Sequence, residues 1–367
     1  MSFLKNREAV RTCILSKRWR HLWRSMPCLD IDYEELISTK EAAAAAAGAA
    51  SGDNSNPAGS DSDDDDNSSD FDDSSSDDDS DDDGSDDSRK RWERFEDFTV
   101  NLMLRCDMAL LESFRLNIGK GRAALRQGQA WGWLRRAIKL SAPAPDPSSS
   151  KRSFSSWNLK RLHLCNVFLD NLFAEHVGSV CRSLQELELD GCRCKIQAIT
   201  SHSLKRLVLK NCRWRELAEI TSPTLKTLDI DGGSNTRTCL LVIWAPAVAY
   251  LHLDVKAADF GGSISIHEMP SLDKASIHIE SHYRYGLYES KFDVNQLNLI
   301  RSLSNVTSLE LSGLGTKVFG KKPALQEFNY LRSLLLGNCN IGDHKLGFFL
   351  NSSPNLENLT LRHCKDA

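Results

Sequence analysis

Cysteine, glycine and lysine occur in short sequences that could bind a metal or a phosphate. Cys192 and Cys194 form a Cys-x-Cys pair, with Cys212 nearby. A structural zinc site needs four ligands at a recognisable spacing, which these three cysteines do not supply. The Gly-Lys-Gly sequence of residues 119–121 lacks the earlier glycine and the following Ser or Thr of a phosphate-binding loop.

The histidines could act in acid–base catalysis, but their ten positions are scattered along the chain. Spacing alone assembles no nucleophile, base and orienting group. His163 and His252 occupy equivalent outward positions in two predicted strands, which fits a binding surface. We therefore predict a non-catalytic protein that holds no metal and no cofactor.

The elements that carry these residues follow from leucine spacing. A Leu-x-x-Leu-x-Leu pattern recurs from Leu159 onward, and alternate apolar residues over five positions predict a short strand with one buried face. Four copies place a cysteine three residues after the last leucine. A small thiol there packs as a hydrophobe and bonds weakly to loop backbone groups. These cysteines are Cys192, Cys212, Cys339 and Cys364.

The copies recur at a nearly constant interval. They begin at residues 159, 184, 204, 225, 248, 272, 306, 331 and 356. Intervals of 20–25 residues are typical of leucine-rich repeats, and the single interval of 34 predicts an insertion at 282–295. Stacked repeats share one apolar core, so we predict an α/β leucine-rich-repeat solenoid of horseshoe shape over 159–367.

The preceding segment, 89–158, is predicted to contain an N-terminal cap and degenerate first repeats. A weaker copy of the repeat pattern lies at Leu111, Phe114 and Leu116. Helical spacing predicts a helix that closes the solenoid's N-terminal end and a second helix on its convex side. The two sets of apolar residues are Trp92, Phe95, Phe98, Leu102 and Met103, then Trp131, Leu134, Ala137 and Ile138.

Residues between the leucines of each strand point away from the core and are predicted to form the concave face. Their charges are mixed, which favours a protein partner over a polyanion. Eight of them are candidate target-binding residues: Arg161, His163, Glu186, Glu188, Arg206, Asp229, Tyr250 and His252.

Charge is segregated along the chain. The net charge is −4, but residues 61–87 hold 16 aspartates and no lysine or arginine. The rest has 46 basic and 50 − 16 = 34 acidic residues, a net charge of +12. Such an acidic tract cannot bury enough apolar surface to offset chain entropy, so we predict a disordered Ala/Ser/Asp-rich insertion over 38–88.

The sequence also bears on the compartment. The longest apolar run, Leu240 to Leu251, is 12 residues long, whereas a membrane-spanning helix takes about 20. Charges at the N-terminus replace the apolar centre of a secretory signal, and 11 cysteines are an odd number. We therefore predict a reducing compartment, the nucleus or the cytoplasm, and no membrane partner.

Residues 1–24 hold seven basic side chains interleaved with apolar and aromatic residues. That pattern occurs in nucleic-acid binding, but a small helical module with an aromatic core is the preferred interpretation, without a specific nucleic-acid partner. The run Ser2–Asp32, with its Arg-Glu-Ala-Val-Arg-Thr-Cys and Leu-Ser-Lys-Arg-Trp-Arg sequences, resembles the F-box of plant F-box/leucine-rich-repeat proteins. Residues 92–118 and the repeats resemble the same family.

The resemblance implies a substrate receptor of a Skp–cullin–F-box ubiquitin ligase. The F-box would dock on the Skp-type adaptor and the repeats would hold the target protein. Residues 1–37 are expected to form a small helical, incomplete F-box, because the Leu-Pro-rich first helix of a full F-box has no counterpart after Met1. The implied adaptor-binding residues are Phe3, Leu4, Val10, Arg11, Leu15, Trp19 and Trp23.

Two further interpretations stay open. One is a non-ligase leucine-rich-repeat scaffold with a degenerate F-box. The other is an acidic, histone-binding leucine-rich nuclear protein. In such proteins the acidic tract follows the repeats, whereas here it precedes them. We also expect an uncapped C-terminal end of the solenoid, because the chain stops three residues after Cys364.

Overall fold

The computed structural model describes residues 22–36, 85–119, 123–140, 158–236, 239–256, 259–260, 264–280, 299–300, 302–313, 327–339, 346–347 and 350–364. The chain divides into one unit of residues 1–32 with 105–367 and another of residues 33–104. The predicted insertion at 282–295 and most of the predicted disordered segment lie outside the described residues.

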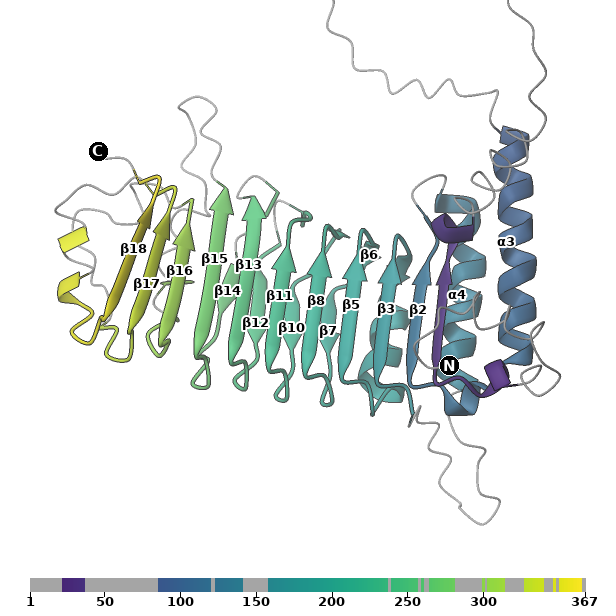
Figure 1. The fold of residues 1–367 in the computed structure, drawn as a ribbon, viewed down its shortest axis with the longest axis horizontal. Helices are drawn as coiled ribbons and strands as arrows, with labels where there is room; N and C mark the ends of the chain where they lie inside the picture. Colours follow the sequence, from purple (N-terminus) through teal and green to yellow (C-terminus); the bar gives the residue numbers. More distant parts are fainter. Residues whose placement is uncertain are drawn as a thin grey trace, which may run out of the picture. The chain divides into compact units, whose positions relative to one another are not determined.

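The larger unit is built on an 11-stranded sheet whose neighbouring strands are all parallel (Figure 1). The nine predicted copies and the weaker upstream copy each form one strand. In sheet order the strands are β1 (Cys28–Asp32), β2 (Ser113–Asn117), β3 (Arg161–Cys165), β5 (Glu186–Asp190), β8 (Arg206–Lys210), β11 (Thr227–Asp231), β13 (Tyr250–Lys256), β15 (Lys274–Glu280), β16 (Ser308–Ser312), β17 (Ser333–Gly337) and β18 (Asn358–Arg362).

The strand register aligns equivalent leucines of successive repeats. Leu187, Leu207 and Leu228 are partners across β5, β8 and β11, and each is buried. The same alternation of buried and more exposed positions runs along most strands. The predicted repeat pattern is therefore confirmed as a stack of strands with one apolar side.

Strand β1 was not expected, because residues 28–32 lie in the segment predicted to be helical. Leu29 and Ile31 are buried and pair in register with Phe114 and Leu116 of β2. Apolar residues alternate here with Asp30 and Asp32, which is a strand pattern. Residues 28–32 thus belong to the repeat sheet and not to a helical module.

A second layer behind this sheet consists mainly of short strands (Figure 1). One helix, α4 (Ala123–Leu140), confirms the prediction around Trp131, and α5 (Asn171–Glu175) continues into a π-helical turn at His176–Val180. The strands form two small parallel sheets, β4 (Phe168–Asp170), β6 (Arg193–Lys195) and β9 (Arg213–Trp214), then β7 (Ala198–Thr200), β10 (Glu219–Thr221), β12 (Leu241–Trp244) and β14 (Ile264–Ile266).

The chain leaves each main strand through a tight turn. The residue after the strand has a positive φ in most repeats, as at Asn166, Gly191 and Asn211. Two residues after the strand, the repeat cysteines donate to the last leucine carbonyl of the preceding strand. The Sγ to oxygen distances are 3.3 Å from Cys192 to Leu164, 3.4 Å from Cys212 to Leu189, 3.7 Å from Cys339 to Leu311 and 3.4 Å from Cys364 to Leu336.

The second unit contains most of α3 (Ser85–Arg105), the helix predicted from Trp92, Phe95, Phe98, Leu102 and Met103. All of these except the half-buried Phe98 are buried. Trp92, Phe95 and Tyr33 form an aromatic cluster with ring centroids 5.1–5.6 Å apart. The helix begins at Ser85, inside the segment predicted to be disordered, and its predicted capping of the repeats stays a prediction.

No helix in the described parts of the chain is long and apolar enough to cross a membrane.

Candidate protein-binding face

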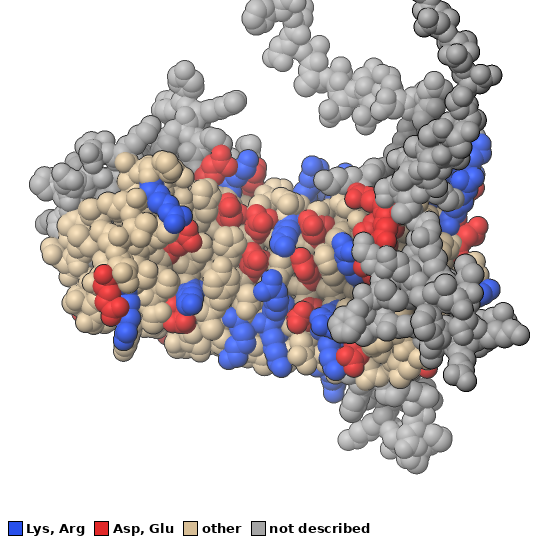
Figure 2. Space-filling view, in the orientation of Figure 1, with Lys and Arg blue, Asp and Glu red and all other residues tan. Residues whose placement is uncertain are grey.

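The open face of the 11-stranded sheet carries the first, third and fifth residues of each five-residue strand, since the second and fourth lie on the opposite side and are buried in all of these strands except β18. Figure 2 shows this face, with charges concentrated over β3 to β15 and few over β16 to β18. All eight predicted target-binding residues lie on it. Arg161, Glu186, Arg206 and Tyr250 are exposed, and His163, Glu188, Asp229 and His252 are half-buried.

The parallel register sorts these eight side chains into two rows that cross the strands. Arg161, Glu186 and Arg206 are direct neighbours in the first row, as are His163 and Glu188 in the second. Asp229 and His252 are neighbours further along the second row. Val208, which lies between Glu188 and Asp229, is buried although it faces outward. The rows therefore combine charged positions with one apolar position.

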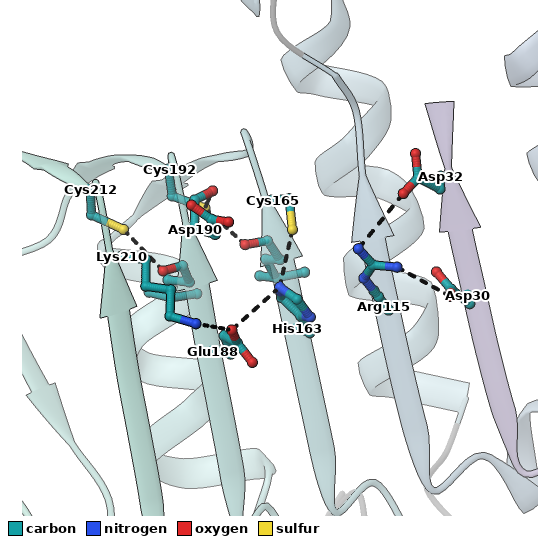
Figure 3. Close-up of polar contacts among 12 residues, drawn as sticks. Asp30, Asp32, Arg115, His163, Cys165, Glu188, Asp190, Cys192, Lys210 and Cys212 are labelled. Atoms are coloured by element: carbon teal, nitrogen blue, oxygen red, sulfur yellow. Dashed lines mark hydrogen bonds and ion pairs between the residues drawn. The ribbon is translucent and has the colours of Figure 1, made fainter. Parts of the chain in front are cut away.

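A first polar cluster joins β1 to β2 (Figure 3). The guanidinium of Arg115 lies 3.3 Å from the Asp30 carboxylate and 3.7 Å from that of Asp32. Burial alone would lower the pKa of Arg115, but Asp30 and Asp32 raise it above its ordinary value. Asn117 donates to Asp32 at 3.3 Å and accepts from Asn166 at 3.1 Å. The cluster thus ties β1, β2 and the turn after β3 together at the strand ends.

A second cluster lies beside it on β3, β5 and β8 (Figure 3). Glu188 accepts from Lys210 at 3.2 Å and lies 3.9 Å from Nε2 of His163. The thiol of Cys165 is 3.1 Å from the same Nε2. Together the clusters place acidic and basic side chains on five neighbouring strands.

The pKa values of His163 and Lys210 in the second cluster shift in opposite directions. Burial lowers the pKa of His163 below its ordinary value and outweighs the opposing attraction of Glu188. His163 is consequently neutral at neutral pH, and its contact with Glu188 is then no ion pair. The hydrogen bond from Lys210 to Glu188 raises the pKa of Lys210, so that pair stays charged.

Among the described residues, some polar side-chain atoms of the open face are buried and make no hydrogen bond. They include Nε of Arg115, Oδ1 of Asp229 and Nδ1 of His252. A buried polar group without a partner costs about 1–3 kcal/mol. Asp229 and His252 lie on adjacent strands, so this cost falls on one part of the second row.

The buried cysteines have the properties of structural thiols. Burial raises the pKa of Cys165 and of Cys181 to about 12 each, and it also raises the pKa of Cys194. Such thiols are protonated at neutral pH and react slowly. Among the described residues, no group of three or more His, Cys, Asp or Glu side chains is arranged to hold a metal ion.

Most of the predicted adaptor-binding residues, Phe3 to Trp19, lie outside the described residues. Trp23 is described and is buried, with the Arg24 guanidinium 6.0 Å from its ring. The adaptor-binding set stays a prediction.

Sequence reasoning missed several residues of the face. Asp30 and Asp32 belong to a strand that was not expected, and Arg115 to a repeat treated as degenerate. Asp190 and Lys210 occupy the fifth strand position, which follows the last leucine and so lies outside the predicted set of residues between the leucines. Leucine alternation extended by one residue would have found both, because odd positions share a face.

Comparisons with known proteins agree with the sequence resemblance. Residues 134–273 match a family model described as FBD-associated F-box protein At5g56370, LRR repeats. The chain is 25% identical over 388 aligned residues to the MEIOTIC F-BOX protein MOF of Oryza sativa subsp. japonica, covering all of this chain and 69% of that protein. It is 54% identical over 41 residues to the F-box/FBD/LRR-repeat protein At5g53840 of Arabidopsis thaliana, covering 11% of this chain and 9% of that protein. The resemblance to plant F-box/leucine-rich-repeat proteins is thereby confirmed.

Proposed function

We propose that this chain, which resembles plant F-box/leucine-rich-repeat proteins, is the substrate-recognition subunit of a Skp–cullin–F-box ubiquitin ligase. In this role residues 1–37 dock on the Skp-type adaptor, which connects the chain to the cullin core. The open face of the sheet binds the target protein. The proposal places the chain in the nucleus or the cytoplasm.

The similarity to proteins named as F-box proteins is the observation that carries this proposal. Membership of that class suggests an interaction with a Skp-type adaptor. The open face supports the second half of the proposal, because it presents rows of charged side chains on a sheet whose apolar side is already buried. Partner charges can therefore pair with it without disturbing the core.

The role needs no catalytic residue in this chain. Proteins of this kind are generally non-catalytic adaptors, and their effect is to hold two reactants together. Holding a target beside a ligase makes the transfer step effectively intramolecular, which is a large advantage in itself. The chemistry then belongs to other subunits.

A pull-down of the full chain with a purified Skp-type adaptor tests the adaptor half. The variants Leu4→Asp and Leu15→Asp place a charge at predicted adaptor-binding positions and should abolish capture. Leu172→Asp is the matched control, because Leu172 is 51% exposed on α5, outside the predicted adaptor-binding segment, and its replacement should leave capture unchanged. Wild-type chain that is folded yet fails to capture the adaptor would overturn the ligase assignment and favour the scaffold alternative.

A further inference from the structure

The charges of the open face are sorted along the strand direction. Basic side chains gather at the strand starts and acidic ones toward the strand ends, as Figure 2 shows for the two halves of the face. The basic band is defined as Lys160, Arg161, Lys205, Arg206 and Lys226, at or just before the starts of β3, β8 and β11. The acidic band is defined as Glu188, Asp190, Asp229, Asp231 and Asp254, in the middles and ends of β5, β11 and β13.

Most of these charges have no partner within the described chain. Lys160 pairs with Glu112, and Glu188 pairs with Lys210. The other members, four basic and four acidic, form no ion pair with a described residue. Glu186 interrupts the basic band between Arg161 and Arg206. With these neighbours included, the basic band carries 5 − 2 = +3 (Glu112, Glu186) and the acidic band −5 + 1 = −4 (Lys210).

The spacing of the bands limits what can bind across them. The first and fifth residues of a strand are about 13 Å apart at the usual rise of about 3.3 Å per residue. The Debye length at 0.1 M salt is about 10 Å, so each band attracts its own counter-charge. A uniformly acidic or uniformly basic partner would be attracted by one band and repelled by the other. A nucleic acid is disfavoured for the same reason, because its phosphates would lie over the acidic band.

We infer that the occupant of the open face is a charge-polarised protein segment, acidic at one end and basic at the other, which lies along the strands across β3 to β13. Its acidic end contacts the basic band and its basic end the acidic band. The distance between the bands corresponds to about nine residues of helix or four of extended chain. The inference rests on the proposed function in taking this face as the target site, and it adds the chemical class of the target.

Two details of the face fit such an occupant. Asp229 is half-buried on β11 at the acidic band, where a lysine or arginine could donate to the accessible part of its carboxylate. Charge-assisted hydrogen bonds of this kind are among the strongest in proteins. Tyr250, 40% exposed at the start of β13, offers an aromatic surface near the basic band. Exposed tyrosines are favoured anchors in protein interfaces.

Two synthetic peptides of the same composition test the inference on the full chain. Each has four glutamates, four alanines and four lysines. In the block peptide the four glutamates come first, the alanines follow and the lysines come last. In the other peptide glutamate and lysine alternate along the whole length, with the alanines between them, so neither end is acidic or basic. Fluorescence anisotropy at about 50 mM salt should show the block peptide binding at least about tenfold tighter, and the difference should shrink at about 300 mM salt. Equal affinity of the two peptides for the wild-type chain would overturn the inference.

Charge reversal locates the binding. Arg206→Glu with Lys226→Glu changes the basic band from +3 to 3 − 4 = −1, and Asp231→Lys with Asp254→Lys changes the acidic band from −4 to −4 + 4 = 0. Each pair alone should strongly reduce the preference for the block peptide, and all four together should abolish it, because the two bands then carry only −1 and 0. Lys195→Glu with Arg213→Glu makes the same charge change at exposed sites on β6 and β9 and should have no effect.

Unchanged block-peptide binding by either double variant would also contradict the inference. Thermal unfolding of each variant separates a binding effect from a folding defect, and the comparison of peptides on the wild-type chain needs no variant. The assay uses no adaptor. The peptide assay therefore tests the polarised face alone, and the pull-down tests the ligase role alone. Failure of one proposal can be told from failure of the other.

Discussion

The guanidinium of Arg115 lies 3.3 Å from the carboxylate of Asp30, although the two residues are 85 positions apart in the chain. The contact is possible because β1 and β2 pair in register, so Asp30 and Arg115 are neighbours on the open face. The acidic tract lies between them in the sequence and does not interrupt the sheet. The first strand of the repeat sheet is therefore supplied by the N-terminal segment.

Replacing Arg115 should weaken the attachment of β1. Arg115→Ala removes the cation that contacts the carboxylates of Asp30 and Asp32, and both carboxylates are partly buried. We expect a loss of about 1–3 kcal/mol in the free energy of unfolding, measured by urea titration. A double-mutant cycle with Asp30→Asn should give a coupling of at least about 0.5 kcal/mol. Lys160→Ala, which removes an exposed pair with Glu112, should change stability by less than about 0.5 kcal/mol.

The strand register predicts opposite sensitivities for neighbouring residues. Leu207→Ala and Leu334→Ala each remove a buried side chain and leave a cavity, so each should cost about 2–5 kcal/mol. Glu186→Ala and Arg206→Ala change exposed positions and should cost less than about 0.5 kcal/mol. Chemical unfolding of the four variants measures the difference. If Glu186→Ala and Arg206→Ala lowered the free energy of unfolding while the two leucine variants did not, the buried and open faces of the strands would be exchanged.

Two glycines should respond to alanine with opposite signs. Gly233 has a φ of +85°, and a Cβ there would lie 2.3 Å from the carbonyl oxygen of Cys212. Gly233→Ala should therefore cost more than about 1 kcal/mol. Gly132 is exposed in α4 with nothing within 4 Å of an added Cβ, so Gly132→Ala should gain about 0.5–1 kcal/mol from helix propensity. Melting temperatures that move in the same direction would refute this contrast.

The buried thiols should be protected from alkylation. Cys165 and Cys181 have pKa values raised to about 12 by burial, so they stay protonated even at pH 9. Iodoacetamide labelling read by mass spectrometry should leave them unmodified in the folded chain and modify them in denaturant. The partly exposed Cys28 and Cys364 serve as internal references that should be labelled first. Labelling of Cys181 at the rate of Cys28 would contradict its burial.

His163 should make stability depend on pH below neutrality. Its pKa in the folded chain is lowered from 6.5, so the unfolded chain binds more protons as the pH falls. Stability is then full above about pH 6.5 and decreases as the pH falls through the folded pKa. His163→Gln should flatten this decrease. Glu188→Gln removes an attraction that raises the pKa, so it should move the NMR titration of His163 to still lower pH. A wild-type midpoint at or above 6.5 would refute the assignment.

The strands were predictable from the sequence because burial of one face imposes a period of two on the leucines. Leu187, Leu207 and Leu334 follow that period, and each lies in the core. The turn after each strand was partly visible, since the repeat cysteines follow the last leucine at a constant distance. Their donation to the preceding strand's carbonyl required the register, which only the stacked structure provides.

The open-face clusters could not be predicted for a related reason. Which acid lies beside which base depends on the neighbouring strand, and Asp30 neighbours Arg115 only because β1 precedes β2 in the sheet. The short second-layer strands such as β9, with two residues, are too brief to show any period. Lys210 lies outside the predicted face because that prediction covers only residues between the leucines, and Lys210 follows the last one. Its odd strand position would have placed it on the same face.

The pairing of β1 with β2 has a consequence for chain connectivity. Asp32 and Ser113 lie on neighbouring paired strands, so β1 can stay in the sheet even when the chain between these two residues is cut. A protease cut placed in residues 38–84 should leave two fragments that remain associated through five backbone register pairs and the Arg115 contacts. The protein would then behave as a split protein, in which the N-terminal peptide complements the repeat sheet. The length of the acidic tract is correspondingly free to vary, since doubling a loop costs only about 0.6 kcal/mol in closure entropy.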